Sequence, residues 1–243
     1  MQRLGIDIGG SGIKGAPVDL DSGTFAEERL RIPTPDGGRP ADVAKVVAEI
    51  VAHFPHVDGP VGCTFPAVMS NGVALTAANV DDSWIGTDAQ ALFKQAAGRD
   101  FVVVNDADAA GIAEMRHGAG NGERGVVLML TLGTGIGSAL FVDGVLVPNT
   151  EFGHLEVNGK EAEHRAAESV RETHDLKWKE WAERLDEVIA AMDRVLWPEL
   201  IMIGGGVSKK SEKFLPHLNP RARVIPAQLL NDAGIIGAAL ATS

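Results

Sequence analysis

The feature that most constrains the fold of this chain is a pattern that occurs once in each half. The segments "GIDIGGSGIKGAPVD" (5–19) and "LTLGTGIGSALFVDG" (130–144) each read as a strand, a glycine-rich turn and a second strand. Further along, "NDADAAGIA" (105–113) and "NDAGIIGAA" (231–239) share the pattern N-D-A-x-x-x-G-x-A at the expected start of a helix. The repeat predicts a duplicated α/β fold, with one glycine hairpin and one connecting helix in each half. If the halves face each other, both hairpin tips reach one cleft.

The first glycine turn contains a literal G-x-G-x-x-G, "GSGIKG" (10–15). In dinucleotide-binding proteins this motif ends a strand and opens a helix. Here "APVDLDSG" (16–23) follows, in which apolar and polar residues alternate and Pro17 disfavours a helix interior. We therefore predict a second strand, which excludes the dinucleotide-binding motif. A hairpin tip with free backbone N–H groups can still hold a phosphate, and a tight hairpin without a ligand is the alternative.

Short apolar strands alternate with helices along the rest of the chain. The predicted strands cover residues 3–8, 12–19, 59–65, 101–106, 126–133, 137–144 and 200–206. The predicted helices cover residues 41–54, 88–98, 106–118, 175–196 and 232–241. In the helix 175–196, Trp178 and Trp181 recur with Leu185, Met192 and Val195 at helical spacing, so both tryptophans are predicted to be core residues.

Composition limits the class of protein. The chain has 243 residues, 45% of them hydrophobic and 23% charged, which is typical of a globular protein with one large or two modest domains. The single cysteine, Cys63, excludes an internal disulfide and a cysteine-rich zinc cluster. A net charge of -11 argues against a general nucleic-acid binder. The sequence shows no membrane-length apolar run, and "MQRLGIDIGG" begins a strand in place of a signal segment, so we expect a cytoplasmic protein with no membrane partner.

Several motifs in order resemble the ROK branch (repressor, open reading frame, kinase) of the sugar kinase and actin superfamily. "GIDIGGSGIKG" and "LGTGIGSAL" resemble its two phosphate motifs, "IGGGVS" its nucleotide-side glycine motif, and "EFGHLE" its E-x-G-H sugar motif. The longer strings "TAANVDDSWIGTD", "EFGHLEVNGKEAEHRA" and "GGGVSKKSEKFLP" are similar to the polyphosphate glucokinases within that family. The resemblance covers the chain end to end. It implies a duplicated actin-like (ribonuclease H-like) ATPase fold with two lobes around a cleft.

The resemblance also implies an activity and a domain division. Residues 1–105 plus 232–243 would form the smaller lobe and residues 106–231 the larger one, with the two N-D-A helices as the hinge. The reaction would transfer the terminal phosphoryl group of inorganic polyphosphate to the 6-hydroxyl of glucose, with Mg²⁺ as cofactor, in a homodimer. An ATP-dependent ROK hexokinase is the first alternative, and a catalytically silent sugar-responsive regulator is the second. No helix-turn-helix precedes the first strand, so a DNA-binding repressor is not expected.

Asp106 is the candidate general base. It follows an apolar strand and precedes a helix, so a simple N-cap is the alternative role. Asp232 holds the matching place in the second half, and the residues alone do not separate the two. The resemblance does, because the base of the family is the aspartate of the first N-D pair.

The resemblance places polar side chains on the sugar hydroxyls, where carboxylate, amide and imidazole groups can share several hydrogen bonds. These residues are Asn105, Glu151, His154 and Glu163. For Glu163 the competitor is Glu156. The remaining wall of the predicted sugar pocket is Thr64, Pro66, Asn79 and Trp84. For Trp84 a packing role is the alternative.

The predicted phosphate site combines glycines, hydroxyls and lysines. Its residues are Gly9, Gly10, Ser11, Gly12 and Lys14; Gly133, Thr134, Gly135 and Gly137; and Gly204, Gly205, Gly206, Lys209 and Lys210. Asp7 is expected to organise Mg²⁺ through water, with bracing of the hairpin as the alternative. The lysines suit a chain of phosphates, and a solvated helix face is the alternative. "GHLEVNGKEAEHRAAES" contains no cysteine, so we expect no structural zinc.

Overall fold

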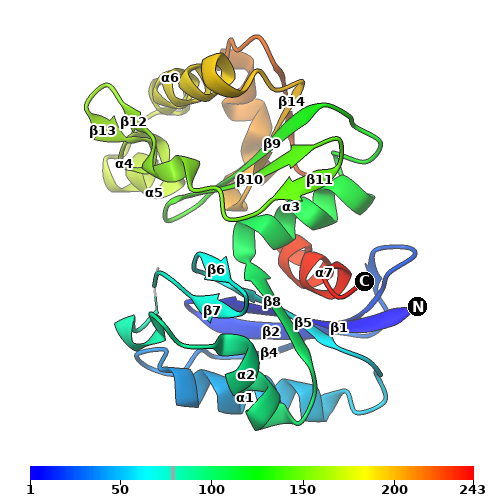
Figure 1. The fold of residues 1–243 in the computed structure, drawn as a ribbon. Coiled ribbons are helices and arrows are strands. Elements are labelled where there is room, and N and C mark those ends of the chain that lie inside the picture. The colour runs from blue at the N-terminus through cyan, green and yellow to red at the C-terminus, as the bar shows by residue number, and fades with distance from the viewer. Residues whose placement is uncertain (78–79) are drawn as a thin grey trace. The chain divides into compact units, whose positions relative to one another are not determined.

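The structure is a computed structural model that describes residues 1–77 and 80–243. It divides into two compact units, residues 1–113 with 232–243 (unit 1) and residues 114–231 (unit 2). The chain passes from unit 1 to unit 2 inside α3 (Asp106–His117), whereas the predicted division lies at the first residue of that helix. The labels in Figure 1 follow the order of the elements along the chain.

Unit 1 contains a sheet with the strand order β3-β2-β1-β5-β8, and β4 pairs with β2 beside this path. Its strands are β1 (Gln2–Gly9), β2 (Gly12–Asp19), β3 (Thr24–Phe25), β4 (Leu30–Ile32), β5 (Val61–Phe65) and β8 (Phe101–Asn105). A small hairpin consists of β6 (Met69–Ser70) and β7 (Val73–Ala74). The helices are α1 (Pro40–His53), α2 (Ala89–Ala97) and α7 (Ala233–Leu240), with short 3₁₀ turns η1 (Asp82–Trp84) and, leading into α7, η5 (Leu230–Asp232).

Unit 2 contains a sheet with the strand order β11-β10-β9-β14-β15. Its strands are β9 (Val126–Leu132), β10 (Ile136–Val142), β11 (Val145–Val147), β14 (Leu200–Gly204) and β15 (Arg223–Pro226). A second small hairpin consists of β12 (Glu156–Val157) and β13 (Lys160–Glu161). The helical segments are α4 (Ala162–Ala166), α5 (Glu168–Thr173), α6 (Trp178–Leu196), η2 (Phe152–His154), η3 (Gly206–Lys213) and η4 (Leu215–His217).

The two sheets have the same topology. In unit 1, β1 pairs antiparallel with β2 and parallel with β5, and β5 pairs parallel with β8. In unit 2, β9 pairs antiparallel with β10 and parallel with β14, and β14 pairs parallel with β15. The predicted duplicated α/β fold is therefore confirmed. The residues after "GSGIKG" continue the strand β2, and Pro17 lies inside this strand. The prediction of a second strand in place of a helix is therefore confirmed.

Successive side chains of β1 point to opposite faces of the sheet, and different helices cover these two faces. Leu4, Ile6 and Ile8 are buried in the core that α1 and α2 complete. On the other face, a Cβ atom on Gly5 would lie 2.0 Å from the carbonyl oxygen of Ile235 in α7. Only a residue without a side chain lets the α7 backbone approach this closely. Asp7 shares that face, which brings it to the first turn of α7.

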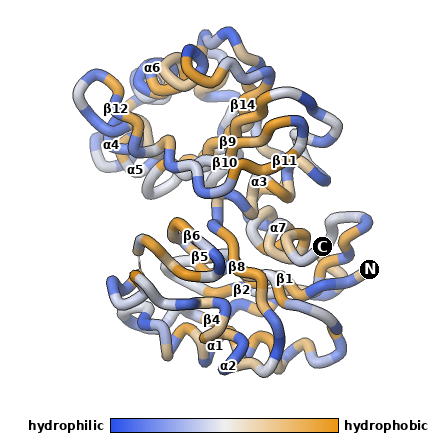
Figure 2. Tube along the Cα trace, viewed as in Figure 1, coloured by the Kyte–Doolittle hydropathy of each residue, from blue (hydrophilic) through white to orange (hydrophobic). Residues whose placement is uncertain are grey.

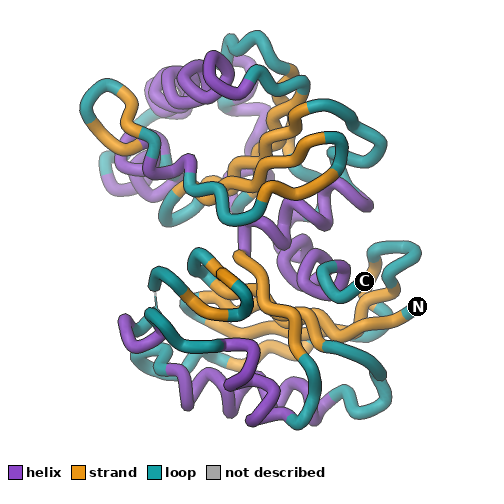
Figure 3. The backbone as a smooth tube through the Cα atoms, in the orientation of Figure 1, coloured by secondary structure: helices purple, strands orange, loops and turns teal. Residues whose placement is uncertain are grey.

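In unit 2, α6 packs against the central strands. Leu128, Leu130 and Leu132 of β9 share a core with Trp181 and Leu185 of α6, and Figure 2 shows hydrophobic residues along β9 and β14. Figure 3 traces α6 as the long helix above this sheet. None of the helices in the described ranges combines the length and apolar character that a membrane crossing needs.

The tryptophans of the predicted helix 175–196 differ in burial. Trp181 is fully buried, which confirms its predicted core role. Trp178, at the first position of α6, is half-buried and packs on the edge of the core. Val195 is 74% exposed, so the prediction that it continues the apolar stripe is wrong. In the last turn of α6 the core contact is made by the neighbouring Leu196, which is half-buried.

A buried carboxylate ties together the two segments where the chain enters and leaves unit 2. Glu114 of α3 is 0% exposed. Its Oε1 accepts hydrogen bonds from the backbone N–H groups of Gln228 (2.9 Å) and Leu229 (2.7 Å), and its Oε2 accepts one from Ala119 (2.8 Å). Three donors compensate for the burial of this side chain.

Candidate functional site

Asp7 is held at the end of β1 by two side chains. The Thr64 hydroxyl donates to Asp7 Oδ1 (2.9 Å), and Lys14 Nζ lies 3.4 Å from Asp7 Oδ2. Lys14 is the cross-strand partner of Asp7 on β2, so both side chains emerge on the same face of the sheet. A Cβ atom on Gly234, in the first turn of α7, would lie 3.0 Å from Asp7 Oδ1. The carboxylate is 19% exposed and therefore accessible to a small ion or a water molecule.

Thr64 is buried within unit 1, and its hydroxyl is engaged in hydrogen bonds. It is 0% exposed, and besides donating to Asp7 its hydroxyl accepts a hydrogen bond from the Ile8 N–H (3.2 Å). The prediction that Thr64 lines the sugar pocket is corrected on this point: its hydroxyl is used in orienting Asp7.

The tip of the first hairpin, Gly9 to Gly12, joins β1 to β2 without a helix. Thr34 Oγ1 donates to the carbonyl oxygen of Gly9 (2.5 Å), and Arg31 Nη2 donates to that of Ser11 (2.9 Å). Arg31, which the sequence analysis did not single out, is the cross-strand partner of Lys14. Two cations thus lie side by side on adjacent strands behind the tip. The sequence could have indicated the strand that carries Arg31, because polar and apolar residues alternate in "RLRIPTP" (29–35) as they do in a strand.

A polar pocket of about 330 Å³ adjoins this tip. Its lining includes Gly10 of the hairpin, Thr34 and Asp36 of the following loop, and Asp81. The pocket lies between the predicted phosphate hairpin and the loop 34–38 of unit 1, for which no role was predicted.

The aspartates Asp106 and Asp232, which occupy equivalent positions in the repeat, have different environments. Asn105 caps α3, because its side-chain oxygen accepts hydrogen bonds from the N–H groups of Ala107 (2.8 Å) and Asp108 (3.1 Å). Asp106 is exposed, and its Oδ1 accepts from the Ala107 N–H (2.9 Å). Asp232 instead pairs with Arg29 (3.0 Å) and makes no side-chain cap to α7. The capping role considered for both aspartates belongs to Asn105 in the first half.

Two predicted sugar-pocket residues lie at the ends of β5 and β8. Asn105 is 8% exposed, and its Nδ2 donates to the carbonyl oxygen of Ala67 (3.1 Å), next to the half-buried Pro66. This bond joins the ends of two neighbouring strands. Asn79 lies outside the described residues.

Trp84 is a core residue. It is 0% exposed, its indole N–H donates to the carbonyl oxygen of Gly38 (2.7 Å), and its ring packs against Phe65 and Phe93. The predicted contact between Trp84 and the sugar is therefore corrected in favour of the packing role. A buried indole with a satisfied N–H offers no surface to a polar ligand.

In unit 2, the E-x-G-H segment and the strand β13 bring an imidazole and carboxylates together. His154 Nδ1 lies 3.3 Å from Glu161 Oε2 and 4.0 Å from Glu163 Oε1. Glu156 forms no ion pair with His154 among the described residues, so the geometry favours Glu163 over this competitor. Glu161 was not predicted, although it stands two residues before Glu163 in the motif "KEAEHRA".

Glu163 also contacts the second hairpin. Its Oε2 accepts a long hydrogen bond from the Ile136 N–H (3.4 Å), and a Cβ atom on Gly135 would lie 2.4 Å from that oxygen. A side chain at Gly135 would displace the carboxylate. The glycine therefore allows the predicted sugar-binding and phosphate-binding groups of unit 2 to touch.

Glu151 precedes this group and remains accessible to water. Partial burial of its carboxylate raises the pKa of Glu151 above the ordinary value of 4.5, with His154 opposing the rise and the charge of Glu163 adding to it. Burial disfavours the charged form of a carboxyl group.

His154, Glu161 and Glu163 each offer a ligand atom, and these atoms lie within 4.8 Å of one another. Structural zinc in closed sites is most often bound through cysteine thiolates. The single cysteine of the chain, Cys63, is buried in β5 of unit 1, so a thiolate zinc site cannot form in unit 2. The three side chains are instead already engaged with one another and with the second hairpin.

The second hairpin tip, Gly133 to Gly135, joins β9 to β10 before Gly137. It is fixed from outside by Ser169, whose N–H donates to the Gly133 carbonyl (3.1 Å) and whose hydroxyl donates to the Thr134 carbonyl (2.6 Å). The tip has the same place in its sheet as the Gly9–Gly12 tip has in the sheet of unit 1.

The glycine motif Gly204–Gly206 ends β14 and opens η3. Gly205 has a φ of 85°, and a Cβ atom there would lie 2.1 Å from the carbonyl oxygen of Leu132, so no other residue fits. Lys209 and Lys210 follow in η3, and both are exposed. The three phosphate-related segments of unit 2 thus lie at the carboxyl ends of β9 and β14.

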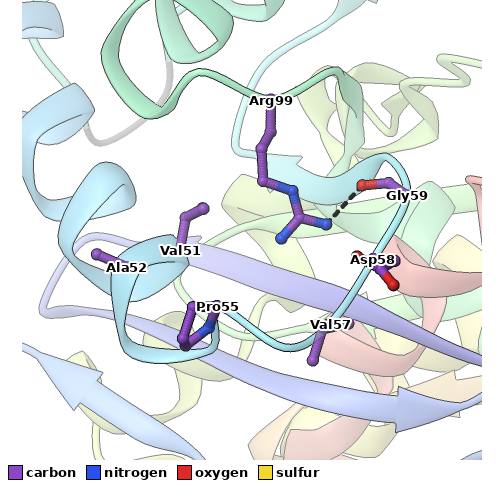
Figure 4. Close-up of a pocket in the computed structure, with 7 residues that line it drawn as sticks. All are labelled: Val51, Ala52, Pro55, Val57, Asp58, Gly59 and Arg99. Carbon is purple, nitrogen blue, oxygen red and sulfur yellow. Dashed lines mark hydrogen bonds between the residues drawn. The ribbon is translucent and has the colours of Figure 1, made fainter.

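Another pocket in unit 1 lies apart from these residues. It measures about 430 Å³ and is lined by the end of α1 and the loop before β5, with Arg99 donating to the Gly59 carbonyl (2.5 Å; Figure 4). None of the predicted site residues lines it.

Comparison with known proteins agrees with this arrangement. The sequence profile of the ROK family matches residues 3–164. The chain is 52% identical over 240 residues to a polyphosphate glucokinase of Mycobacterium tuberculosis (strain CDC 1551 / Oshkosh), covering 98% of this chain and 90% of that protein. It is 48% identical over 241 residues to the polyphosphate glucokinase of Mycobacterium leprae (strain TN), covering 99% and 74%. The crystal structure of inorganic polyphosphate/ATP-glucomannokinase from Arthrobacter sp. strain KM is 48% identical, with a TM-score of 0.93 and coverage of 98% of this chain and 97% of that one.

Proposed function

Because the chain belongs to the ROK family, we propose that it is a polyphosphate-dependent glucokinase that forms glucose 6-phosphate from glucose and inorganic polyphosphate. The observation that carries this proposal is the 52% identity to a polyphosphate glucokinase over 98% of the chain. Both glycine hairpins and the E-x-G-H group are present and well formed in their units. The experiment that tests it is a matrix of initial rates with polyphosphate and ATP as donors and with glucose and mannose as acceptors.

The proposed sugar-binding groups are Asn105 and Pro66 of unit 1 and Glu151, His154 and Glu163 of unit 2. In support, Asn105 is fixed by hydrogen bonds at the end of β8, and in unit 2 His154 Nδ1 lies 4.0 Å from Glu163 Oε1. Fixed amide and carboxylate groups can orient a polyol without rearrangement. Asn79 stays a prediction.

The proposed general base is Asp106, which would accept the proton of the 6-hydroxyl as the phosphoryl group is transferred. The exposure of Asp106 at the start of α3 supports this role, and Asn105 supplies two hydrogen bonds that cap the helix. Phosphoryl transfer needs such a group to orient the hydroxyl, together with donors that neutralise the transferred charge.

The proposed donor site uses the backbone of both hairpins, Ser11, Thr134 and Lys14, with Lys209 and Lys210 beside the glycine motif. A magnesium ion would be held near Asp7 through water, since its carboxylate is accessible and lies beside the first hairpin. When bound, the ion would neutralise phosphate charge. Lys14 and Thr64 would keep Asp7 in place.

ATP is the alternative donor, because the Arthrobacter relative is an inorganic polyphosphate/ATP-glucomannokinase. A catalytically silent regulator is the weaker alternative, and any measurable turnover would exclude it. We further propose that the protein acts in the cytoplasm as a homodimer. The family resemblance is the basis for the dimer, and light scattering of the purified protein tests it.

The binding of glucose should depend on pH through Glu151. Its raised pKa means that the carboxylate becomes protonated at a higher pH than an ordinary glutamate as the solution is acidified. Above that pKa the charged group accepts hydrogen bonds from the sugar, and below it the group loses this capacity. We expect the KM for glucose to rise on acidification from a pH above 4.5, and the Glu151→Gln variant to lose this acid limb. An acid limb that is identical in both proteins would assign it to another group.

The donor preference should be sensitive to salt. A polyphosphate chain carries charge along its whole length, so its affinity falls as salt rises in the manner of other polyanions. We expect higher kcat/KM with polyphosphate than with ATP, and a steep loss of the polyphosphate rate with added salt. The variant with Lys209→Ala and Lys210→Ala should weaken polyphosphate more than ATP. Equal turnover with ATP at matched magnesium would point to an ATP-dependent hexokinase.

A further inference from the structure

Three cations of unit 2 gather around one indole ring. The guanidinium carbon of Arg171 lies 4.3 Å from the centre of the Trp178 ring, and the ammonium nitrogens of Lys213 and Lys210 lie 5.7 and 5.8 Å from it. All three distances are within the range of cation–π attraction. We call Arg171, Lys210, Lys213 and Trp178 the basic cluster.

The indole ring is held rigidly by the core beneath it. Trp178 stacks on Phe214 at an interplanar angle of 19° and meets Trp181 edge-on at 81°. Phe214 and Trp181 are both fully buried. The ring therefore forms a fixed platform, and the three flexible side chains around it lose less freedom when they bind a ligand than they would on open surface.

The short helix α5 links the basic cluster to the second phosphate hairpin. Ser169, near the start of α5, bonds the carbonyl oxygens of Gly133 and Thr134 at the hairpin tip. Arg171 follows two residues later on the same helix. On the other side, the Glu168 carboxylate lies 3.5 Å from the Cβ position of Gly206, where η3 begins. The hairpin, the glycine motif and the basic cluster are thus neighbours within unit 2.

Lys210 and Lys213 are exposed, and the Arg171 side chain is 16% exposed. Among the described residues, Glu172 is the one carboxylate that forms an ion pair with a member of the cluster, at 3.3 Å from Arg171 Nη2. Arg171 Nε is buried and has no hydrogen-bond partner. Glu168 is the other nearby acid, and its partial burial raises its pKa, with Glu172 adding to the rise and Arg171 and Lys210 opposing it. A buried carboxyl of this kind is more easily neutralised than an ordinary one.

We propose that the basic cluster binds the distal phosphate units of the polyphosphate donor, those beyond the units held at the glycine hairpins, and so gives the enzyme its preference for long chains. This inference rests on the proposed function. A linear polyphosphate presents anionic oxygens on every unit, and arginine can hold such oxygens with two parallel hydrogen bonds while lysines add point charges. A nucleoside at the same place would present an uncharged base and ribose, which gain little from three cations.

The test compares long-chain polyphosphate with tripolyphosphate at saturating glucose. In the variant with Arg171→Ala and Lys213→Ala, we expect kcat/KM for the long chain to fall about tenfold or more, as the loss of one or two charge-assisted contacts predicts. The value for tripolyphosphate should change less than about twofold, because the proposal assigns the units of this short donor to the glycine hairpins. The salt slope for the long chain should become less negative by about one for each cation removed. The Arg171→Lys variant keeps the positive charge and should therefore keep part of the kcat/KM for the long chain. The melting temperature of this variant shows whether it folds.

A control for the arginine is Arg194→Ala, which removes one positive charge of the same kind from the same unit. Arg194 is exposed and stands sixteen residues after Trp178 on α6, about 24 Å away at the helical rise of about 1.5 Å per residue. An equal loss in this control, or an unchanged ratio of long-chain to tripolyphosphate kcat/KM in the cluster variant, would overturn the inference. A wild-type enzyme that uses neither polyphosphate would overturn the proposed function itself, so the two failures are distinct.

Trp178 is a positioning residue in this proposal, and fluorescence gives a readout apart from turnover. Long-chain polyphosphate added without glucose should change the tryptophan emission of the wild type, and Trp178→Phe should abolish that change. Trp197→Phe is the control, because Trp197 is 65% exposed and also carries an arginine, Arg221, 4.5 Å from its ring centre. A polyphosphate-dependent signal that survives in Trp178→Phe and is lost in Trp197→Phe would contradict the assignment.

Discussion

Replacing Asp106 by asparagine is expected to lower kcat by at least about a hundredfold, the usual contribution of a positioned general base. The KM for glucose should stay within a few-fold of the wild-type value, because asparagine keeps the size and hydrogen-bonding shape of the side chain. Folding should be little affected, since Asn105 and not Asp106 supplies the two hydrogen bonds that cap α3. Steady-state kinetics with glucose and polyphosphate measure both parameters.

The structure provides a control for this experiment in the second half of the repeat. Asp232 stands in the same N-D-A motif, but its carboxylate pairs with Arg29 and its side chain is 49% exposed. An exposed ion pair of this kind contributes about 0 to 1 kcal/mol to stability. Asp232→Asn should therefore leave kcat nearly unchanged. If Asp232→Asn were the inactive variant and Asp106→Asn the active one, the roles of the two halves would be reversed.

Replacing Glu114 by alanine is expected to lower the free energy of unfolding by about 3 kcal/mol, because three backbone N–H groups lose their acceptor in a buried place. Glu114→Gln should have a smaller effect. One amide oxygen can still accept from Gln228 and Leu229, while the amide nitrogen then faces the N–H of Ala119, a donor against a donor. Urea or thermal unfolding, monitored by circular dichroism, measures the difference.

The control for the Glu114 variants is Glu183→Ala. Glu183 is an exposed residue of the helix α6, so its replacement removes the same atoms without a buried acceptor. Surface changes of this kind usually stay within about 0.5 kcal/mol of the wild type. A Glu114→Ala protein as stable as Glu183→Ala would show that water replaces the lost carboxylate. The hydrogen bonds of Glu114 would then contribute nothing to the free energy of unfolding.

The backbone of this protein was largely predictable because its signals are local. Glycine turns between apolar strands have few alternative conformations, so both hairpins and the strand containing Pro17 could be read from their own residues. The strand β15 was missed, because "RVIP" is short and ends in a proline. Its place at the edge of a parallel sheet depends on β14, a neighbour that is distant in sequence.

The site was less predictable than the fold because side-chain contacts depend on tertiary neighbours. Trp84 stands between turn residues, which is compatible with an exposed ring, yet Phe65 and Phe93 bury it. Thr64 could have faced a sugar, but the register of β1 and β5 sets it opposite Asp7. Arg31 needed the pairing of β4 with β2 before its position beside Lys14 could be known.

The close packing of α7 on the sheet of unit 1 affects the order in which the two units can fold during synthesis, because α7 is the last helix of the chain. Cβ atoms at Gly5 and Gly62 would lie 2.0 and 1.7 Å from carbonyl oxygens of α7, so the backbone of this helix packs directly on the backbone of β1 and β5. Residues 114–231 leave the ribosome before residues 232–243 do, and unit 2 therefore has its whole sequence available first. The face of β1 and β5 that carries Gly5 and Gly62 stays uncovered until a helix is made more than one hundred and fifty residues later. A nascent chain halted before α7 would therefore hold the sheet of unit 1 with one face open to water.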